Sequence, residues 1–271
     1  MPGENLTRQE AQARSEILKV DSYMVEVNLT ENPKVFPYVS TVTFACSTEG
    51  AETFIDAITA SVESIELNGL NLDPSEYSDG TRITLPGLKL ENQLIVKAHG
   101  FFSNSGEGLH RFVDPVDNEV YFYTQFEVPD SRRMFAVFEQ PDLKASFEFK
   151  VIGNQDWQMI SNSTTPEPVL IGDGLERWDF APTPRISSYI TALVAGPYTV
   201  WLLYTSPSPR DGPLYRMPTA PPNKNTNNHT HPPTTPPPHS PPPPPPPTHT
   251  HTHNHTHTHT PTHPHTHTHH T

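Results

Sequence analysis

The sequence has almost no cysteine. Cys46 is its only one among 271 residues, so no intrachain disulfide can form. Disulfide-stabilised secreted domains are thereby excluded, and a reducing compartment is favoured. The N-terminus is polar as far as Glu16 and lacks the basic start and apolar stretch of a secretory signal. We therefore predict a cytoplasmic protein.

Basic residues are also scarce. Lys and Arg number 17 against 30 Asp and Glu, which gives a formal net charge of −13. Surfaces that bind nucleic-acid phosphates are usually basic, so a nucleic-acid partner is not expected. Long apolar runs are missing too, and none approaches the roughly 18 residues of a membrane helix. We therefore expect no membrane partner.

The composition divides the chain into two parts. Residues 1–201 hold 13 of the 33 prolines and 2 of the 16 histidines, whereas residues 202–271 hold the other 20 and 14. The first part carries a formal charge of 14 − 29 = −15, and about 200 residues are enough for a sizeable core. We predict a folded domain over residues 1–201 and a disordered Pro/His/Thr low-complexity tail over residues 202–271.

The first predicted element is a short helix near the N-terminus. Thr7 can serve as its N-cap, and Glu10 three residues later completes a capping box. Its apolar side is expected to consist of Ala11, Ala13, Ile17 and Leu18.

Strand patterns fill most of the remaining first part. Apolar residues alternate with polar ones after residue 20, as half-buried strands require. One alternating face comprises Tyr23, Val25, Val27 and Leu29, and another comprises Val42, Phe44 and Cys46. Asn-Gly, Asp-Gly and Pro-Gly turn signals at 68–69, 79–80 and 86–87 separate further runs. Further strands are predicted at 65–67, 70–72, 82–85, 94–98, 120–126, 144–152, 158–161, 176–180 and 188–194.

About a dozen short strands with little helix predict an all-β fold, as a sandwich or a curved pair of sheets. Residues 129–138 are the exception, because Pro129-Asp130-Ser131 can begin one helical turn there. An interruption of this kind beside a strand end is a reasonable place for a functional site.

The most specific stretch of the sequence is residues 121–145, which read YFYTQFEVPDSRRMFAVFEQPDLKA. It resembles the M1 family of zinc metallopeptidases, whose pattern is T-Q-x-E, then R-R-x-F, then an aromatic residue, an acid and Pro-Asp. The flanking stretches GEGLHRF at 106–112 and ALVAGPY at 192–198 agree. The resemblance covers about residues 5–201. Within that range the sequence is similar to bacterial, particularly actinobacterial, members of the aminopeptidase N type. It implies the curved, saddle-like N-terminal β-sandwich of these enzymes.

The resemblance implies roles for two residues. Gln125 and Glu127 would line the pocket for the first residue of a peptide, with Glu127 helping to hold its free α-ammonium group. A carboxylate accepting charge-assisted hydrogen bonds can select a charged amino terminus over a neutral peptide. Strand alternation also predicts that both side chains share one face of one strand. From spacing alone, an exposed polar pair on a sheet face is the alternative.

Other candidate residues have simpler interpretations. Arg132 and Arg133 could bind a carboxylate, but pairing with nearby acids to pin the turn is the favoured hypothesis. Cys46 falls in an alternating apolar strand and is expected to be a small core residue. His99 and His110 lack neighbouring liganding residues in the sequence, so a metal role is not favoured.

The motif that would hold zinc is missing. The family requires H-E-x-x-H on a helix plus a further Glu, with the motif's own Glu activating metal-bound water. Neither His99 nor His110 is followed by Glu, and the last Glu in the chain is Glu176. The G-A-M-E-N substrate loop is absent too. The resemblance therefore implies zinc in the full-length parent, and we predict that this chain binds no zinc specifically and hydrolyses no peptide.

The tail has a nucleotide-level explanation. Residues 202–211, LLYTSPSPRD, match the in-frame translation of a transposase-type sequencing adaptor, and the Thr-His alternation after residue 248 matches a translated CA repeat. We expect the evolved sequence to stop near Trp201. Fourteen tail histidines would then bind metals only weakly, without defined coordination.

Three functional hypotheses follow. The first is a fragment of an M1 aminopeptidase that supplies the anchoring part for peptide amino termini and lacks its catalytic domain. The second is a stand-alone, non-catalytic β domain that binds peptides or a partner protein. The third is a His-rich, metal-sequestering protein, which would require its function to vanish with residues 202–271.

Overall fold

The computed structural model describes residues 5–199. The predicted domain boundary at Trp201 and the predicted disorder of residues 202–271 lie outside the described residues. Within residues 5–199, no helix is both long enough and apolar enough to cross a membrane.

The N-terminal helix α1 (Arg8–Ile17) confirms the predicted cap and differs in its buried side. The Thr7 backbone N–H donates to Glu10 Oε2 at 2.8 Å, and the Glu10 backbone N–H donates to Thr7 Oγ1 at 3.2 Å. The buried helix residue is Arg14, whereas Ala13 is exposed and Leu18 already belongs to the first strand. The prediction was right for Leu18, which is buried, and for Ile17, which packs against the core, but it missed Arg14, whose buried ion pair occupies this side of the helix.

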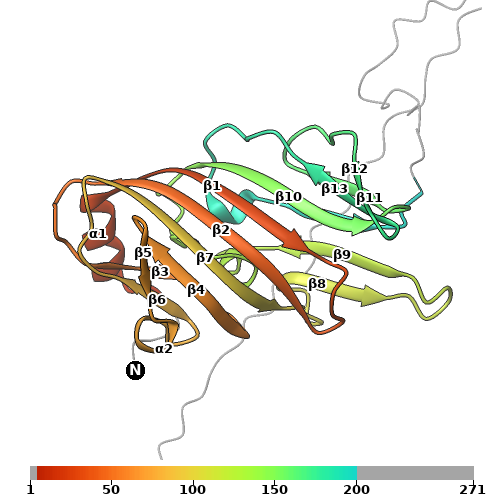
Figure 1. Cartoon of the computed structure of the whole chain (residues 1–271), viewed down its shortest axis with the longest axis horizontal. Coiled ribbons are helices and arrows are strands. Elements are labelled where there is room, and N and C mark those ends of the chain that lie inside the picture. Colours follow the sequence, from red (N-terminus) through yellow and green to blue (C-terminus); the bar gives the residue numbers. More distant parts are fainter. Residues whose placement is uncertain (1–4, 200–271) are drawn as a thin grey trace, which may run out of the picture. The chain divides into compact units, whose positions relative to one another are not determined.

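The large sheet contains eight strands in the order β12-β13-β10-β1-β2-β7-β4-β5. β1 pairs in parallel with β10, and the other neighbours are antiparallel. Figure 1 shows β10, β1, β2 and β7 as long, twisted strands lying side by side. The bounds are β1 Leu18–Asn28, β2 Val35–Cys46, β4 Ser61–Leu67, β5 Leu70–Leu72, β7 Glu91–Phe101, β10 Ser146–Asn154, β12 Val169–Gly172 and β13 Leu175–Asp179.

Two smaller sheets complete the fold. A four-stranded sheet has the order β11-β14-β9-β8, and β3 pairs with β6 in a two-stranded sheet. Their bounds are β3 Thr53–Asp56, β6 Arg82–Leu85, β8 Gly108–Val113, β9 Val120–Gln125, β11 Gln158–Ser161 and β14 Leu193–Gly196. The remaining short elements are helix α2 (Pro74–Tyr77) and the 3-10 turns η1 (Ser131–Arg133) and η2 (Ser188–Ile190). The all-β sandwich prediction is confirmed.

The segment 134–140 passes through the middle of this sandwich, and every one of its residues is buried. Hydrogen bonds fix it to the large sheet, because Ser40 Oγ donates to the Ala136 carbonyl at 2.8 Å and the Phe138 N–H donates to Tyr23 Oη at 3.1 Å. Phe135 makes edge-on ring contacts with Phe126, Phe147 and Phe149. Residues 134–140 therefore anchor the stretch 121–145, which resembles the M1 pattern, in the core.

Some predicted elements have different bounds. Residues 188–194 are not one strand, since η2 occupies Ser188–Ile190 and β14 begins at Leu193. The cause is local: Thr191 bonds back to the Ser188 carbonyl through its N–H at 3.0 Å and its hydroxyl at 2.7 Å. The helical turn predicted within 129–138 is confirmed only for η1. Cys46 is a buried strand residue, as predicted.

Candidate functional site

Gln125 and Glu127 lie where β9 leads into a turn. Gln125 is the last residue of β9 and pairs with Gly108 of β8, whereas Glu127 lies two residues later in the turn. Both are exposed, and Phe126 between them is buried against Phe135 at a ring distance of 6.2 Å. The prediction that both belong to one strand was wrong, because the ladder stops at Gln125.

Neither side chain is engaged within the described domain. Among residues 5–199, no hydrogen bond or ion pair reaches the Gln125 amide or the Glu127 carboxylate. Such groups keep their full hydrogen-bonding capacity for water or for a ligand. The alternative of an exposed polar pair on a sheet face is right about the exposure of both side chains, but Glu127 lies in a turn rather than on the sheet. Exposure does not exclude ligand binding.

The turn that carries Glu127 is supported from both ends. At the β9 end, the Leu193 N–H of β14 donates to Thr124 Oγ1 at 2.8 Å. At the η1 end, Arg133 Nε lies 2.6 Å from Asp130 Oδ1, and Arg133 Nη2 lies 3.7 Å from Glu107 Oε2. The prediction that Arg133 pins the turn through a nearby acid is confirmed.

Glu139 supports η1, which follows the turn that carries Glu127. The residue is 4% exposed, and its carboxylate accepts hydrogen bonds from the Ser131 hydroxyl, from the Arg132 N–H at 2.9 Å and from the Ser188 hydroxyl at 2.6 Å. Burial raises its pKa above the usual value, against the opposing effect of these donors. Since Ser131 belongs to η1 and Ser188 to η2, one carboxylate joins η1, which follows the turn that carries Glu127, to η2.

A buried ionic cluster lies next to Glu139. Asp56 accepts the Glu139 N–H at 3.1 Å and pairs with Arg14 Nη1 at 2.8 Å. Arg82 Nε lies 3.8 Å from Asp56, and Arg82 Nη1 lies 2.7 Å from Glu10. These residues tie α1 to β3 and β6. Sequence reasoning missed them because their partners lie far apart in the chain.

The two described histidines have ordinary partners. His99 Nδ1 lies 3.3 Å from Ser61 Oγ and 3.5 Å from Glu63 Oε1, and His110 accepts the Gly106 N–H at 3.1 Å. Within residues 5–199, no three His, Cys, Asp or Glu side chains converge as a metal site would require. The described residues therefore do not fit a zinc ion, and the tail histidines lie outside the described residues.

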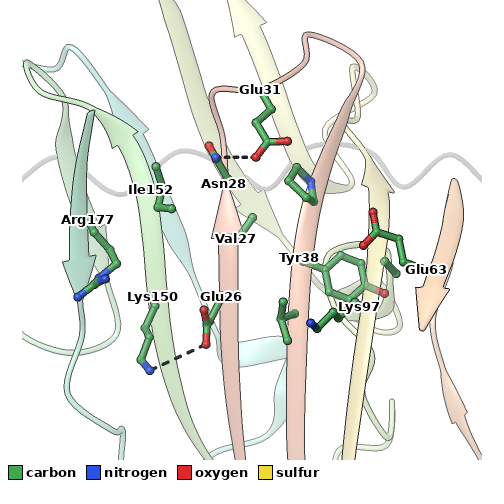
Figure 2. A pocket seen from close by; sticks show the side chains of 13 residues that line it. Glu26, Val27, Asn28, Glu31, Tyr38, Glu63, Lys97, Lys150, Ile152 and Arg177 are labelled. Atoms are coloured by element: carbon green, nitrogen blue, oxygen red, sulfur yellow. Dashed lines mark hydrogen bonds and ion pairs between the residues drawn. The ribbon is translucent and has the colours of Figure 1, made fainter. Parts of the chain in front are cut away.

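A hollow of about 210 Å³ lies on the large sheet, away from this turn (Figure 2). Its lining mixes acids and bases, among them Glu26, Glu63, Lys97 and Lys150. Glu26 and Lys150 already face each other at 4.0 Å. Gln125 and Glu127 do not line this hollow, and its mixed charge indicates no particular ligand.

Comparison with known proteins decides the family. The model of the peptidase M1 N-terminal domain matches residues 19–190, which is more than half of the chain. The chain belongs to the peptidase M1 family.

Relatives of this M1 domain are aminopeptidases from all three domains of life. The chain is 53% identical to aminopeptidase N of Streptomyces lividans over 201 residues, covering 73% of this chain and 23% of that protein. It is 33% identical over 140 residues to probable aminopeptidase 1 of Saccharolobus solfataricus, covering 48% and 18%. It is 30% identical over 91 residues to bovine aminopeptidase N, covering 32% and 9%. The chain therefore spans less than a quarter of each of these relatives.

Proposed function

We propose that this chain is the part of an aminopeptidase that anchors the amino terminus of a peptide. Family membership and the aminopeptidase relatives support the reaction class. The single observation that carries the anchoring role is the exposed Glu127 carboxylate, which has no polar partner among residues 5–199 and lies two residues after Gln125. A carboxylate in this state can accept charge-assisted hydrogen bonds from an α-ammonium group.

The proposal separates binding from hydrolysis. Orienting a peptide does not cleave it without a Lewis acid or a general base near the scissile bond. The whole sequence has no H-E-x-x-H motif. We propose that the zinc and the catalytic base of the parent enzyme lie in the polypeptide that this chain does not span. The purified chain should hydrolyse no aminoacyl-nitroanilide, and chelator-sensitive turnover would contradict this.

Peptide binding tests the anchoring role directly. The full 271-residue chain would be titrated with a short peptide and with the same peptide acetylated at its amino terminus, using calorimetry. The free amine should bind more tightly, and Glu127→Gln should remove roughly tenfold or more of that preference, since a hydrogen bond to a charged group is worth about 1.5–3 kcal/mol.

A matched control lies at the other end of the same strand. Glu119 is an exposed carboxylate just before β9, so Glu119→Gln removes the same charge without touching the turn. It should leave the preference for the free amine unchanged. Equal binding of the free and acetylated peptides by the unmodified chain would refute the anchoring role.

We also propose a cytoplasmic location for the protein. The support is the single cysteine of the sequence, since proteins of reducing compartments carry no structural disulfides. Fractionation of cells that express the chain, followed by immunodetection, would test this location, and recovery from the medium or the periplasm would contradict it.

A further inference from the structure

A cavity of about 190 Å³ lies where the connection between β1 and β2 approaches β8. Figure 1 shows α1 at one end of the domain and the β8–β9 hairpin, which forms part of the cavity wall, at the other. The third part of the wall is the connection from β10 to β11, which supplies Asn154 and Trp157. Gln125 and Glu127 do not line this cavity. It therefore has to be considered separately from the peptide site.

The charge of the cavity is unlike that of the domain around it. Arg111 is the only charged residue that lines it, whereas residues 1–201 hold 29 Asp and Glu against 14 Lys and Arg. Arg82 and Arg177, the two other arginines in the described strands, are each paired with a carboxylate, at 2.7 and 2.9 Å. The Arg111 side chain has no hydrogen bond or ion pair within residues 5–199. Its guanidinium keeps five N–H donors for a ligand.

The strand register places Arg111 on the core side of its sheet. Its partner on β9 is Phe122, which is fully buried, and residues directly opposite each other point to the same face. β8 is an edge strand of the sheet and Arg111 is half-buried, so its aliphatic stem covers the rim of the core and its guanidinium faces the cavity. Trp157, which is 7% exposed, packs against Phe122 with ring centroids 5.3 Å apart. One wall of the cavity is therefore aromatic.

Two asparagines and an indole add further donors. Asn32 Oδ1 accepts the Lys34 N–H at 2.8 Å and the Val35 N–H at 3.3 Å, so the amide nitrogen of Asn32 remains free to donate. The Asn154 amide and the Trp157 indole N–H have no hydrogen-bond partner within the described domain. A ligand here meets several donors, an aromatic wall and no carboxylate. Such surroundings select an anionic acceptor on an apolar body.

We propose that this cavity binds a small organic acid, a carboxylate carried on an aromatic or branched aliphatic body. The two carboxylate oxygens pair with the Arg111 guanidinium, whose N–H donors match their spacing. Asn32 and Asn154 donate to the remaining lone pairs, and the body lies against Trp157 and Phe122. One arginine balances the single charge of a carboxylate, whereas a phosphate monoester carries about two charges.

Titration with two simple acids tests the site. Phenylacetate and isovalerate would be added to the full 271-residue chain, with the affinity measured by calorimetry and the indole N–H signal of Trp157 followed by NMR. We expect saturable binding that shifts this signal. Arg111→Gln should weaken binding about tenfold or more, and Arg111→Lys should weaken it less, because an ammonium keeps the charge without the paired donors. No saturable binding of either acid would overturn the proposal.

Two controls separate this site from general attraction of anions. Arg8 on α1 is exposed and its side chain has no polar partner within residues 5–199, so Arg8→Gln removes the same charge at the other end of the domain. It should leave the affinity unchanged. Phenylacetamide and inorganic phosphate should each bind at least about tenfold more weakly than phenylacetate. Equal weakening by both arginine variants, or equal binding of phenylacetamide or phosphate, would overturn the assignment to an organic acid.

A second variant covers the case in which Arg111→Gln does not fold. Asn154 is exposed and its side chain has no partner within the described domain, so Asn154→Asp should fold. The added carboxylate would repel the ligand and compete for Arg111, which should weaken binding about tenfold or more. Asn154→Ser adds no charge and should weaken binding less. Unchanged affinity in Asn154→Asp would overturn the proposal.

The acid site and the peptide site can be tested independently. Glu127→Gln should leave phenylacetate binding unchanged, and Arg111→Gln should leave the preference for free amino termini unchanged. If Glu127→Gln weakened phenylacetate binding as much as Arg111→Gln does, the acid would not occupy this cavity. Loss of the amino-terminal preference alone would contradict only the anchoring role.

Discussion

Asp56 and Glu127 are both carboxylates of this domain, and they have opposite surroundings. Asp56 is 1% exposed and bonds to Arg14 and to the Glu139 backbone. Glu127 is exposed and has no polar partner within residues 5–199. The Asp56 carboxylate is engaged by groups inside the domain, whereas the Glu127 carboxylate remains accessible to a ligand. The two residues are both acids and differ in their interaction partners. Asp56 therefore belongs to the scaffold, and Glu127 belongs to the candidate site.

The largest expected effect is at Asp56. Asp56→Ala would leave Arg14 and Arg82 buried without their shared acceptor, and breaking a buried pair costs roughly 3–5 kcal/mol of unfolding free energy. Urea denaturation would measure it. The exposed Arg177–Asp179 pair, at 2.9 Å, is the control. Asp179→Ala should cost less than about 1 kcal/mol of unfolding free energy. Equal losses for Asp56→Ala and Asp179→Ala would contradict the prediction that the buried pair contributes more.

Glu139 should rank second. Glu139→Gln keeps the shape but turns an amide N–H₂ toward one of the donors that the carboxylate accepts, which should cost about 1–3 kcal/mol. Thermal unfolding would measure the loss. If Glu139→Gln left the melting temperature unchanged, the carboxylate would not be what joins η1 and η2.

The difference in stability between the unmodified chain and Glu139→Gln should change with pH in one direction, which the pKa of Glu139 sets. Burial raises the pKa of Glu139, so the folded state holds the proton more tightly than the unfolded state. Its contribution to stability is full below the unfolded pKa of about 4.5 and declines as pH rises through the folded value. The stability gap between the unmodified chain and Glu139→Gln should therefore narrow as pH rises above 4.5.

Glu10 should show the reverse dependence and a smaller effect. The hydrogen bond from Arg82 lowers its pKa to about 2, so its contribution is present above 4.5 and is lost as pH falls toward 2. Glu10→Gln should cost about 1 kcal/mol at neutral pH, because the carboxylate is partly exposed. Acid titration of the melting temperature should show a shallower decline for the variant, and parallel curves would contradict this.

The smallest effects on stability should be at the candidate site itself. Gln125→Ala and Glu127→Gln remove no partner within the described domain, so each should change the free energy of unfolding by less than about 0.5 kcal/mol. Urea denaturation beside Asp56→Ala gives the direct comparison. A loss above about 1 kcal/mol at either position would mean that these side chains belong to the scaffold.

Local sequence patterns were sufficient where the interactions are local. The capping box at Thr7 and Glu10, the alternating strands β1 and β2, and the buried Cys46 are all as predicted. These features depend on neighbours within a few residues or on strand periodicity. The motif strip around Gln125 also indicated the family, because its order of residues is specific.

Tertiary structure decided the rest. Arg14 is separated from Asp56 by 42 positions and from Gln140 by 126, so no local pattern could show that the side of the helix predicted to be apolar buries an arginine. Likewise, Glu127 leaves the strand because β9 stops pairing with β8 at Gln125, which depends on the partner strand. The sequence by itself determined the all-β class, most of the strands and the family. Only the packing determined which charges are satisfied inside the domain and which remain free to bind.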